Sequence, residues 1–169
     1  MLLKKRNAFT MLELLFVIVI IGILSAIAIP KFAANRDDAV IAKAKTTISA
    51  VRSSISTERQ KRILRGNFVS VYGLSKSATL GKPIFDAFDG NVSNPVLDYG
   101  PISCKTATLD GCWKVKTAGL AGNPGTDAIY TFNMPLTGSV DFTLSSNRFN
   151  CPITGVSAKK IRDCKRLTQ

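Results

Sequence analysis

The chain has 169 residues and a formal charge of +12, with 23 Lys and Arg against 11 Asp and Glu. It contains no histidine, which removes the commonest general base, the usual zinc ligand and every Ser-His or Cys-His pair. No Walker loop, Gly-x-Ser-x-Gly or dinucleotide-binding sequence is present either. We therefore expect a protein that is not an enzyme, built as one long helix and one small globular domain.

A short basic leader precedes a long apolar segment at the N-terminus. Lys4, Lys5 and Arg6 are followed by residues 9–29, in which Glu13 is the only charged residue. At about 1.5 Å per residue this segment forms a helix of roughly 30 Å, which is enough to cross a bilayer. A carboxylate that faces lipid is costly, so Glu13 requires a specific role.

Three interpretations account for this segment. A plain signal anchor, oriented by the positive-inside rule, explains the basic leader but not Glu13. A secretory signal peptide fits the small-x-small pattern that ends at Ala28, which would release a soluble secreted protein. We favour a third: the leader, the sequence Phe9-Thr10-x-x-Glu13 and the span ending at Pro30 resemble the N-terminus of type IV pilins and type II secretion pseudopilins. The resemblance covers about the first 35 residues.

This resemblance implies processing of the leader, residues 1–8. A prepilin peptidase would cut between Ala8 and Phe9 and methylate the new amine, which stays cationic at neutral pH. The family implies that Glu13 of one subunit neutralises this amine of a neighbour. Because desolvation offsets the attraction, such a pair is better at fixing register than at adding stability.

Gly22 and Pro30 also match positions of the family. Proline has no backbone N–H, and glycine is the weakest helix former in the span. The resemblance therefore implies that these residues let the helix kink or unwind when a subunit leaves lipid for a fibre.

The helical pattern continues through residues 31–65, which would extend the first helix as an amphipathic spine. Glu58 and Arg62 are an i,i+4 pair, and Gly66 is placed as a C-cap. The apolar residues of one helical face step by three and four: Ile41, Ala44, Ile48, Val51 and Ile55.

The globular domain is expected over residues 66–169. Residues 66–111 are predicted to be loop, with a short helix at 83–88. Alternating patterns predict strands at 113–117, 129–134 and 140–144, and Gly138 marks a hairpin connector between the last two. Together these patterns predict an α+β fold in which the long helix packs on an antiparallel sheet of three or four strands within 112–145.

Four cysteines lie in the C-terminal part of the chain, and their spacings fit neither a CxxC redox pair nor a zinc finger. In an oxidising compartment they would form disulfides, with three connectivities available. We favour the two local pairs, which would close the C-terminal region; free thiols are the alternative. The favoured pairs are Cys104 with Cys112 and Cys151 with Cys164.

Two surface features suggest ligands or modification. Secretion pseudopilins often bind Ca²⁺ through loop acids, which makes Ca²⁺ the alternative here. No EF-hand spacing occurs, so solvated acids are the better interpretation and no cofactor is predicted. Asn91 lies in an Asn-x-Ser sequon preceded by Asp89, although Asp-Gly-Asn is also typical of a turn. The acids in predicted loops are Asp86, Asp89, Asp98, Asp110 and Asp127.

A basic cluster near the C-terminus could contact DNA phosphates non-specifically, or it could be a solvated face. Its members are Lys159, Lys160, Arg162, Lys165 and Arg166.

The resemblance implies a structural subunit that is held in the bacterial inner membrane by a single span, with its N-terminus in the cytoplasm and its globular domain in the periplasm. Its partners would be copies of itself, other pilin-like subunits, the prepilin peptidase, and an assembly platform with its ATPase. We favour a type II secretion pseudopilin. A type IV pilin or competence pseudopilin for DNA uptake is the alternative.

Overall fold

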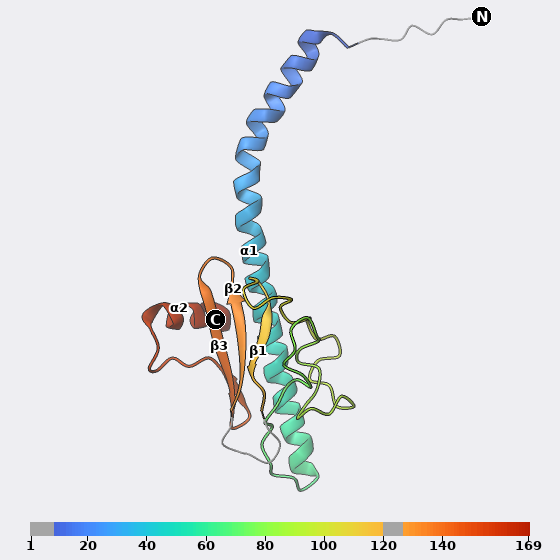
Figure 1. The fold of residues 1–169 in the computed structure, drawn as a ribbon, viewed down its shortest axis with the longest axis vertical. Coiled ribbons are helices and arrows are strands. Elements are labelled where there is room, and N and C mark those ends of the chain that lie inside the picture. Colours follow the sequence, from blue (N-terminus) through green and yellow to red (C-terminus); the bar gives the residue numbers. More distant parts are fainter. Residues whose placement is uncertain (1–8, 120–126) are drawn as a thin grey trace, which may run out of the picture. The chain divides into compact units, whose positions relative to one another are not determined.

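A computed structural model describes residues 9–119 and 127–169, and for residues 30–35 it describes the backbone alone. The chain forms a long helix α1 (Met11–Leu64), four strands and a short C-terminal helix α2 (Ala158–Thr168). Figure 1 shows α1, α2 and the first three strands with their labels. The chain divides into two compact units between Asp38 and Ala39. The second unit contains the sheet, α2 and the C-terminal part of α1. The predicted α+β fold is confirmed.

Local sequence caps both ends of α1. The backbone N–H of Glu13 donates to Thr10 Oγ1 (3.2 Å), so Thr10 is the N-cap. At the other end, the N–H of Gly66 donates to the Ile63 carbonyl (2.9 Å). Gly66 has a φ of 73°, a left-handed conformation that glycine adopts without steric cost. The predicted glycine C-cap is confirmed.

The four strands form one antiparallel sheet in the order β1-β2-β3-β4. Their bounds are Trp113–Thr117, Ala128–Met134, Gly138–Ser145 and Arg148–Asn150. The first three agree with the predicted strands to within two residues. The fourth has only three residues and follows a tight turn in which Ser146 and Asn147 both have positive φ, the conformation of a type I′ hairpin.

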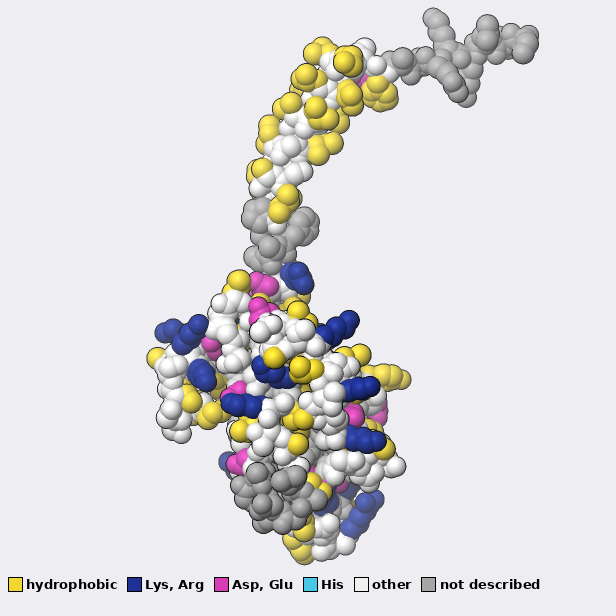
Figure 2. Space-filling view, viewed as in Figure 1, with side chains coloured by type: hydrophobic (Ala, Val, Ile, Leu, Met, Phe, Trp, Pro, Cys, Tyr) yellow, Lys and Arg dark blue, Asp and Glu magenta, His cyan; other side chains and the backbone are white. Residues whose placement is uncertain are grey.

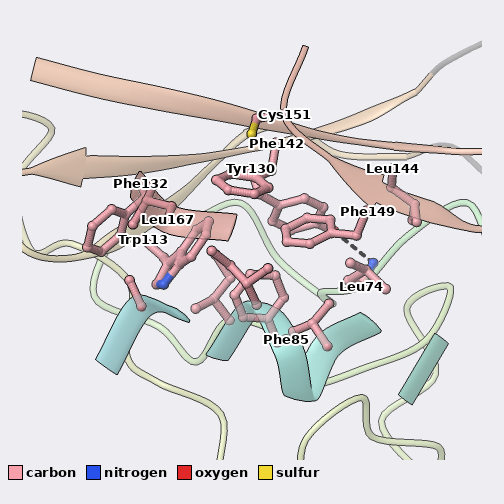
Figure 3. Close-up of a cluster of buried hydrophobic side chains, with 14 of the residues drawn as sticks. Leu74, Phe85, Trp113, Tyr130, Phe132, Phe142, Leu144, Phe149, Cys151 and Leu167 are labelled. Carbon is pink, nitrogen blue, oxygen red and sulfur yellow. Dashed lines mark hydrogen bonds between the residues drawn. The ribbon is translucent and has the colours of Figure 1, made fainter. Parts of the chain in front are cut away.

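One face of the sheet and one face of α1 share an aromatic core, shown in Figure 3. Tyr130 pairs with Phe142 across β2 and β3, and Trp113 pairs with Phe132 across β1 and β2. Phe85 comes from the long loop and packs against Trp113 and Tyr130 with ring centroids 5.4 and 5.2 Å apart. The predicted apolar face of α1 is buried in this core as expected: Ile41, Ala44, Ile48, Val51 and Ile55.

The short helix predicted at 83–88 is wrong. Pro83 forms an isolated antiparallel bridge with Ile102, and Phe85 has a φ of 60°, which no right-handed helix accommodates. The Phe85 carbonyl accepts the N–H of Leu97 (3.0 Å), while Ile84 donates to Pro101 (3.0 Å). Tertiary hydrogen bonds to other loops therefore replace the helical ladder here.

The C-terminal helix α2 was not predicted. Few of its side chains are apolar, and five of its eleven residues are Lys or Arg. Leu167 and Cys164 are nevertheless buried, and Leu167 belongs to the aromatic core. The helix packs on β3, and its few apolar residues, Ile161, Cys164 and Leu167, lie three residues apart on the side that is buried.

Candidate assembly segment and surface sites

The segment Met11–Ile29 of α1 is apolar apart from a few residues, and nearly all of it is exposed. Its mean hydropathy is 2.9, and none of it is buried in the structure. At 1.5 Å per residue its length is about 28 Å, so by length and composition it is able to cross a bilayer. Figure 2 shows this part of the helix covered with hydrophobic side chains. An apolar surface of this size requires lipid or other protein chains to cover it.

Glu13 lies in the first turn of this helix, three residues after the cap. Thr10 and Glu13 hold the N-cap and N3 positions, the spacing of a capping box. An acid at this position also interacts favourably with the helix dipole. Sequence reasoning assigned no role to Thr10, although its Thr-x-x-Glu spacing is a recognised N-terminal signal.

The other predicted assembly residues are less informative. Gly22 lies within α1, and a Cβ added there would meet no atom within 4 Å, so the chain's own packing does not require glycine. Pro30 is helical in its backbone, but its side chain lies outside the described residues, as does the whole of Ala8. Phe9 is described and is largely exposed.

Both local disulfides that the sequence favours are present in the structure. The Cα atoms of Cys104 and Cys112 are 5.3 Å apart, and those of Cys151 and Cys164 are 6.0 Å apart. The first pair closes a loop that is also held from the sheet. Asn133 Nδ2 donates to two carbonyls of this loop, at 3.1 and 2.7 Å.

Asp89 is not the solvated loop acid that we expected. One carboxylate oxygen accepts the backbone N–H groups of Tyr72 (2.8 Å) and Gly73 (2.9 Å). The other accepts a hydrogen bond from Arg62 Nη2 (2.6 Å), and Arg62 Nε also binds Glu58 (2.9 Å). The predicted Glu58–Arg62 pair is confirmed. It forms part of a three-residue cluster that fixes the loop to α1.

The remaining loop acids do not converge. Asp86 accepts the backbone N–H of Lys76 (3.1 Å), and three others are exposed: Asp98, Asp110 and Asp127. Within the described residues, no group of three His, Cys, Asp or Glu side chains lies close enough to hold a metal.

The sequon at Asn91 forms a tight turn. Asp89 and Gly90 both have positive φ, and the N–H of Asn91 donates to the Phe88 carbonyl (2.9 Å). These features define a type I′ turn, which accounts for Asp-Gly at this position. Asn91 and Ser93 are exposed. Glycosylation of Asn91 stays a prediction.

The basic cluster occupies α2, and all five of its side chains are exposed. Lys160 lies beside Asp141, which receives hydrogen bonds from Lys116 (2.8 Å) and Thr131 (2.7 Å). Burial alone would raise the pKa of Asp141, but these hydrogen bonds and the charges of Lys116 and Lys160 outweigh burial and lower it. The structure brings the cluster together on one element, and DNA contact stays a prediction.

Hydrogen bonds that join α1 to β4 were also not predicted from the sequence. Arg52 on α1 donates through Nε to the Phe149 carbonyl (2.9 Å) and through Nη2 to Asn150 Oδ1 (3.0 Å). An arginine in an amphipathic helix gives no sequence signal for a partner 97 residues away.

The comparisons with known proteins find one motif at the N-terminus and two partial similarities to other proteins. Residues 3–29 match the prokaryotic N-terminal methylation motif. The chain is 48% identical over 61 residues to the type IV narrow pilus major component PilA5 of Thermus thermophilus, which is 35% of this chain and 53% of that protein. It is 42% identical over 57 residues to a fimbrial protein of Moraxella nonliquefaciens, which is 34% of this chain and 37% of that protein.

The chain thus spans about half or less of the length of these relatives, and no solved structure matches it significantly. The matched residues include Lys4, Lys5 and Arg6 of the leader, Phe9 and Glu13, which carry most of the predicted resemblance, and they end one residue before Pro30. With this motif, its pilin relatives and its α+β fold, the chain has the features of the type IV pilin-like family.

Proposed function

We propose that the protein is a non-enzymatic structural subunit of a type IV pilin-like filament. The observation that carries the proposal is the exposed apolar segment Met11–Ile29, which has a single acid in its first turn and lies within the methylation motif. Lipid covers this segment before assembly, with the globular unit in the periplasm. The segments of neighbouring subunits cover it in the filament.

The mature N-terminus tests the processing step. We expect a chain that begins at N-methylated Phe9, identified by mass spectrometry of the N-terminal peptide. Two findings would contradict the proposal: a mature chain beginning at Ile29 would mean secretory cleavage, and an unprocessed N-terminus would mean a plain anchor.

Within this class, we propose a pilus subunit in preference to the secretion pseudopilin that the sequence alone favours. The support is that both relatives are named for pili or fimbriae. Deletion of the gene should remove surface filaments and leave exoprotein release normal. Exoproteins trapped in the periplasm of the deletion strain would restore the secretion pseudopilin as the better interpretation.

DNA uptake is a second candidate, favoured by the exposed basic cluster on α2. If it is correct, the full chain in a neutral lipid nanodisc should bind duplex DNA without sequence preference, and log affinity should fall linearly with log salt. Reversing the five charges of the cluster to Glu should abolish this binding and lower transformation. A variant that binds and transforms like the wild type would exclude the cluster from DNA uptake.

A further inference from the structure

A group of apolar side chains is exposed where α1 ends and the chain turns back. This apolar tip consists of Ile63, Leu64, Phe68 and Val69, whose exposed fractions are 44%, 88%, 69% and 62%. Side chains of this kind are normally buried when they are clustered, and a cluster left exposed often marks a binding surface.

The apolar tip is held in a fixed conformation. Arg59 Nη1 donates to the carbonyls of Phe68 (2.8 Å) and Val69 (3.2 Å), which ties the returning chain to the side of α1. The side chain of Asn67 accepts the N–H of Val69 (2.9 Å). The tip is therefore presented to solvent by specific hydrogen bonds.

Its surroundings are cationic. Lys61 and Arg65 are exposed beside the tip, in the last turn of α1 and directly after it. The two nearby carboxylates, Glu58 and Asp89, both form their ion pairs with Arg62, while Lys61 interacts with Glu58 through its charge alone. Figure 2 shows hydrophobic and basic side chains together at the lower end of the globular unit.

We propose that the apolar tip docks into an anionic lipid surface. Apolar side chains enter the headgroup region while flanking Lys and Arg contact the phosphates, which is the arrangement of interfacial membrane anchors. A second copy of this chain carries 23 Lys and Arg against 11 Asp and Glu, so on balance its surface repels the cations beside the tip more than an anionic lipid surface does. Duplex DNA offers the phosphates but no apolar phase for Leu64 and Phe68. A stable protein interface uses about 20–30 residues a side, far more than this tip supplies.

The proposal can be tested with the full chain. Its apolar segment Met11–Ile29 is first embedded in a phosphatidylcholine nanodisc, so that this segment cannot insert into the target vesicles. Loaded nanodiscs are mixed with sucrose-filled vesicles of phosphatidylcholine, with or without phosphatidylglycerol, and the bound fraction is measured by sedimentation. We expect binding to the anionic vesicles only. Leu64→Ser with Phe68→Ser should lower the partition coefficient about tenfold or more, because two apolar contacts are lost.

Matched variants distinguish binding by the tip from non-specific apolar binding and from binding that depends on net charge alone. Leu136→Ser with Tyr99→Ser removes two side chains that are 89% and 97% exposed elsewhere, and should leave binding unchanged. Lys61→Gln with Arg65→Gln should weaken binding more than Lys159→Gln with Lys160→Gln, although net charge is the same. Equal losses within either comparison would overturn the proposal. An absence of binding would also overturn it. So would a competition experiment in which duplex DNA displaces the wild type and the tip variants from the vesicles to the same extent.

These experiments use single chains in nanodiscs, so their outcome does not depend on filament assembly. Failure of the lipid proposal would leave the proposed filament function untouched, and the reverse also holds.

Discussion

The hydroxyl group of Tyr130 is buried in the aromatic core and accepts the backbone N–H of Leu74 (2.7 Å). Burial raises the pKa of Tyr130 from its ordinary value of 10.0 to about 12. Because this pKa is higher in the folded state, the contribution of the Tyr130 hydroxyl group to the free energy of unfolding is fully present below pH 10. That stability is lost as the pH rises toward 12.

We expect Tyr130→Phe to lower the free energy of unfolding at neutral pH by about 1–3 kcal/mol, because the N–H of Leu74 is left buried and unpaired. The difference between the two proteins should shrink above pH 10. There the phenol of the unfolded wild type ionises, which lowers the stability of the wild type but not that of the variant. Urea unfolding at a series of pH values measures both effects. The exposed Tyr99→Phe is the control, and a constant difference at every pH would contradict the assigned role of the phenol.

Arg62 joins two carboxylates from separate parts of the chain. Burial alone would raise the pKa of Glu58, but hydrogen bonds from Arg62 and Asn94 and the charge of Arg62 lower it below its ordinary value of 4.5. The stability that Glu58 contributes is therefore present above pH 4.5. It is lost as the pH falls through the lower, folded pKa.

Replacing Arg62 by Ala should cost about 3 kcal/mol at pH 7, since it leaves two partly buried carboxylates without their cation. The cost should fall as the pH drops below about 4.5 and the carboxyl groups become neutral. Thermal unfolding from pH 3 to pH 7 tests this. Arg65→Ala, an exposed neighbour, should change stability by less than about 0.5 kcal/mol. Equal effects of the two variants would show that the cluster is not specific.

Among the elements, those with a strong period could be predicted from sequence and those fixed by distant contacts could not. The apolar face of α1 and the alternation of β1, β2 and β3 are local patterns, and the structure reproduces them. β4 is too short to show alternation. α2 depends on Leu167 reaching the core and on a covalent link from Cys164. Residues 83–88 lose their helix to hydrogen bonds with loops that lie later in the chain.

The two disulfides stabilise different elements, and we expect their removal to differ accordingly. Cys151→Ser with Cys164→Ser should expose the amides of α2 to rapid hydrogen exchange while β2 and β3 remain protected. In the chain-entropy model a loop of this size contributes about 3 kcal/mol. Cys104→Ser with Cys112→Ser is the matched control, and it should leave α2 protected. Loss of protection across the whole sheet in the first variant would mean that α2 is part of the cooperative core.

At the scale of the whole molecule, α1 serves two environments with different residues. Its face from Ile41 to Ile55 is buried in the globular core, whereas Met11–Ile29 is exposed. The methylation motif and the apolar run are local to the N-terminus, so sequence alone was sufficient to find the exposed apolar segment. The Asp89 cluster and the Arg52 tie join residues far apart in sequence, so only the structure could reveal them.

Variants of Glu13 separate its charge from its position in the capping box. Glu13→Gln keeps a side chain that suits the N3 position but removes the charge, while Glu13→Ala removes both. If Glu13 neutralises the amine of a neighbour, both variants should insert in the membrane yet assemble poorly, as measured by crosslinking and by filaments sheared from cells. Normal assembly of Glu13→Gln, with failure of Glu13→Ala and Thr10→Ala, would show that the cap alone matters.

The hydrogen bonds of Arg52 have a mechanical consequence for a subunit that is pulled. They join α1 to the Phe149 carbonyl and to Asn150, and the next residue, Cys151, is covalently linked to α2. Tension applied along α1 therefore has a polar route to the C-terminal segment, through one side chain and one sulfur bridge, in addition to the packing of the aromatic core. In a fibre under load, Arg52 would help the aromatic core to keep the last strand and helix attached to the helix that bears the force.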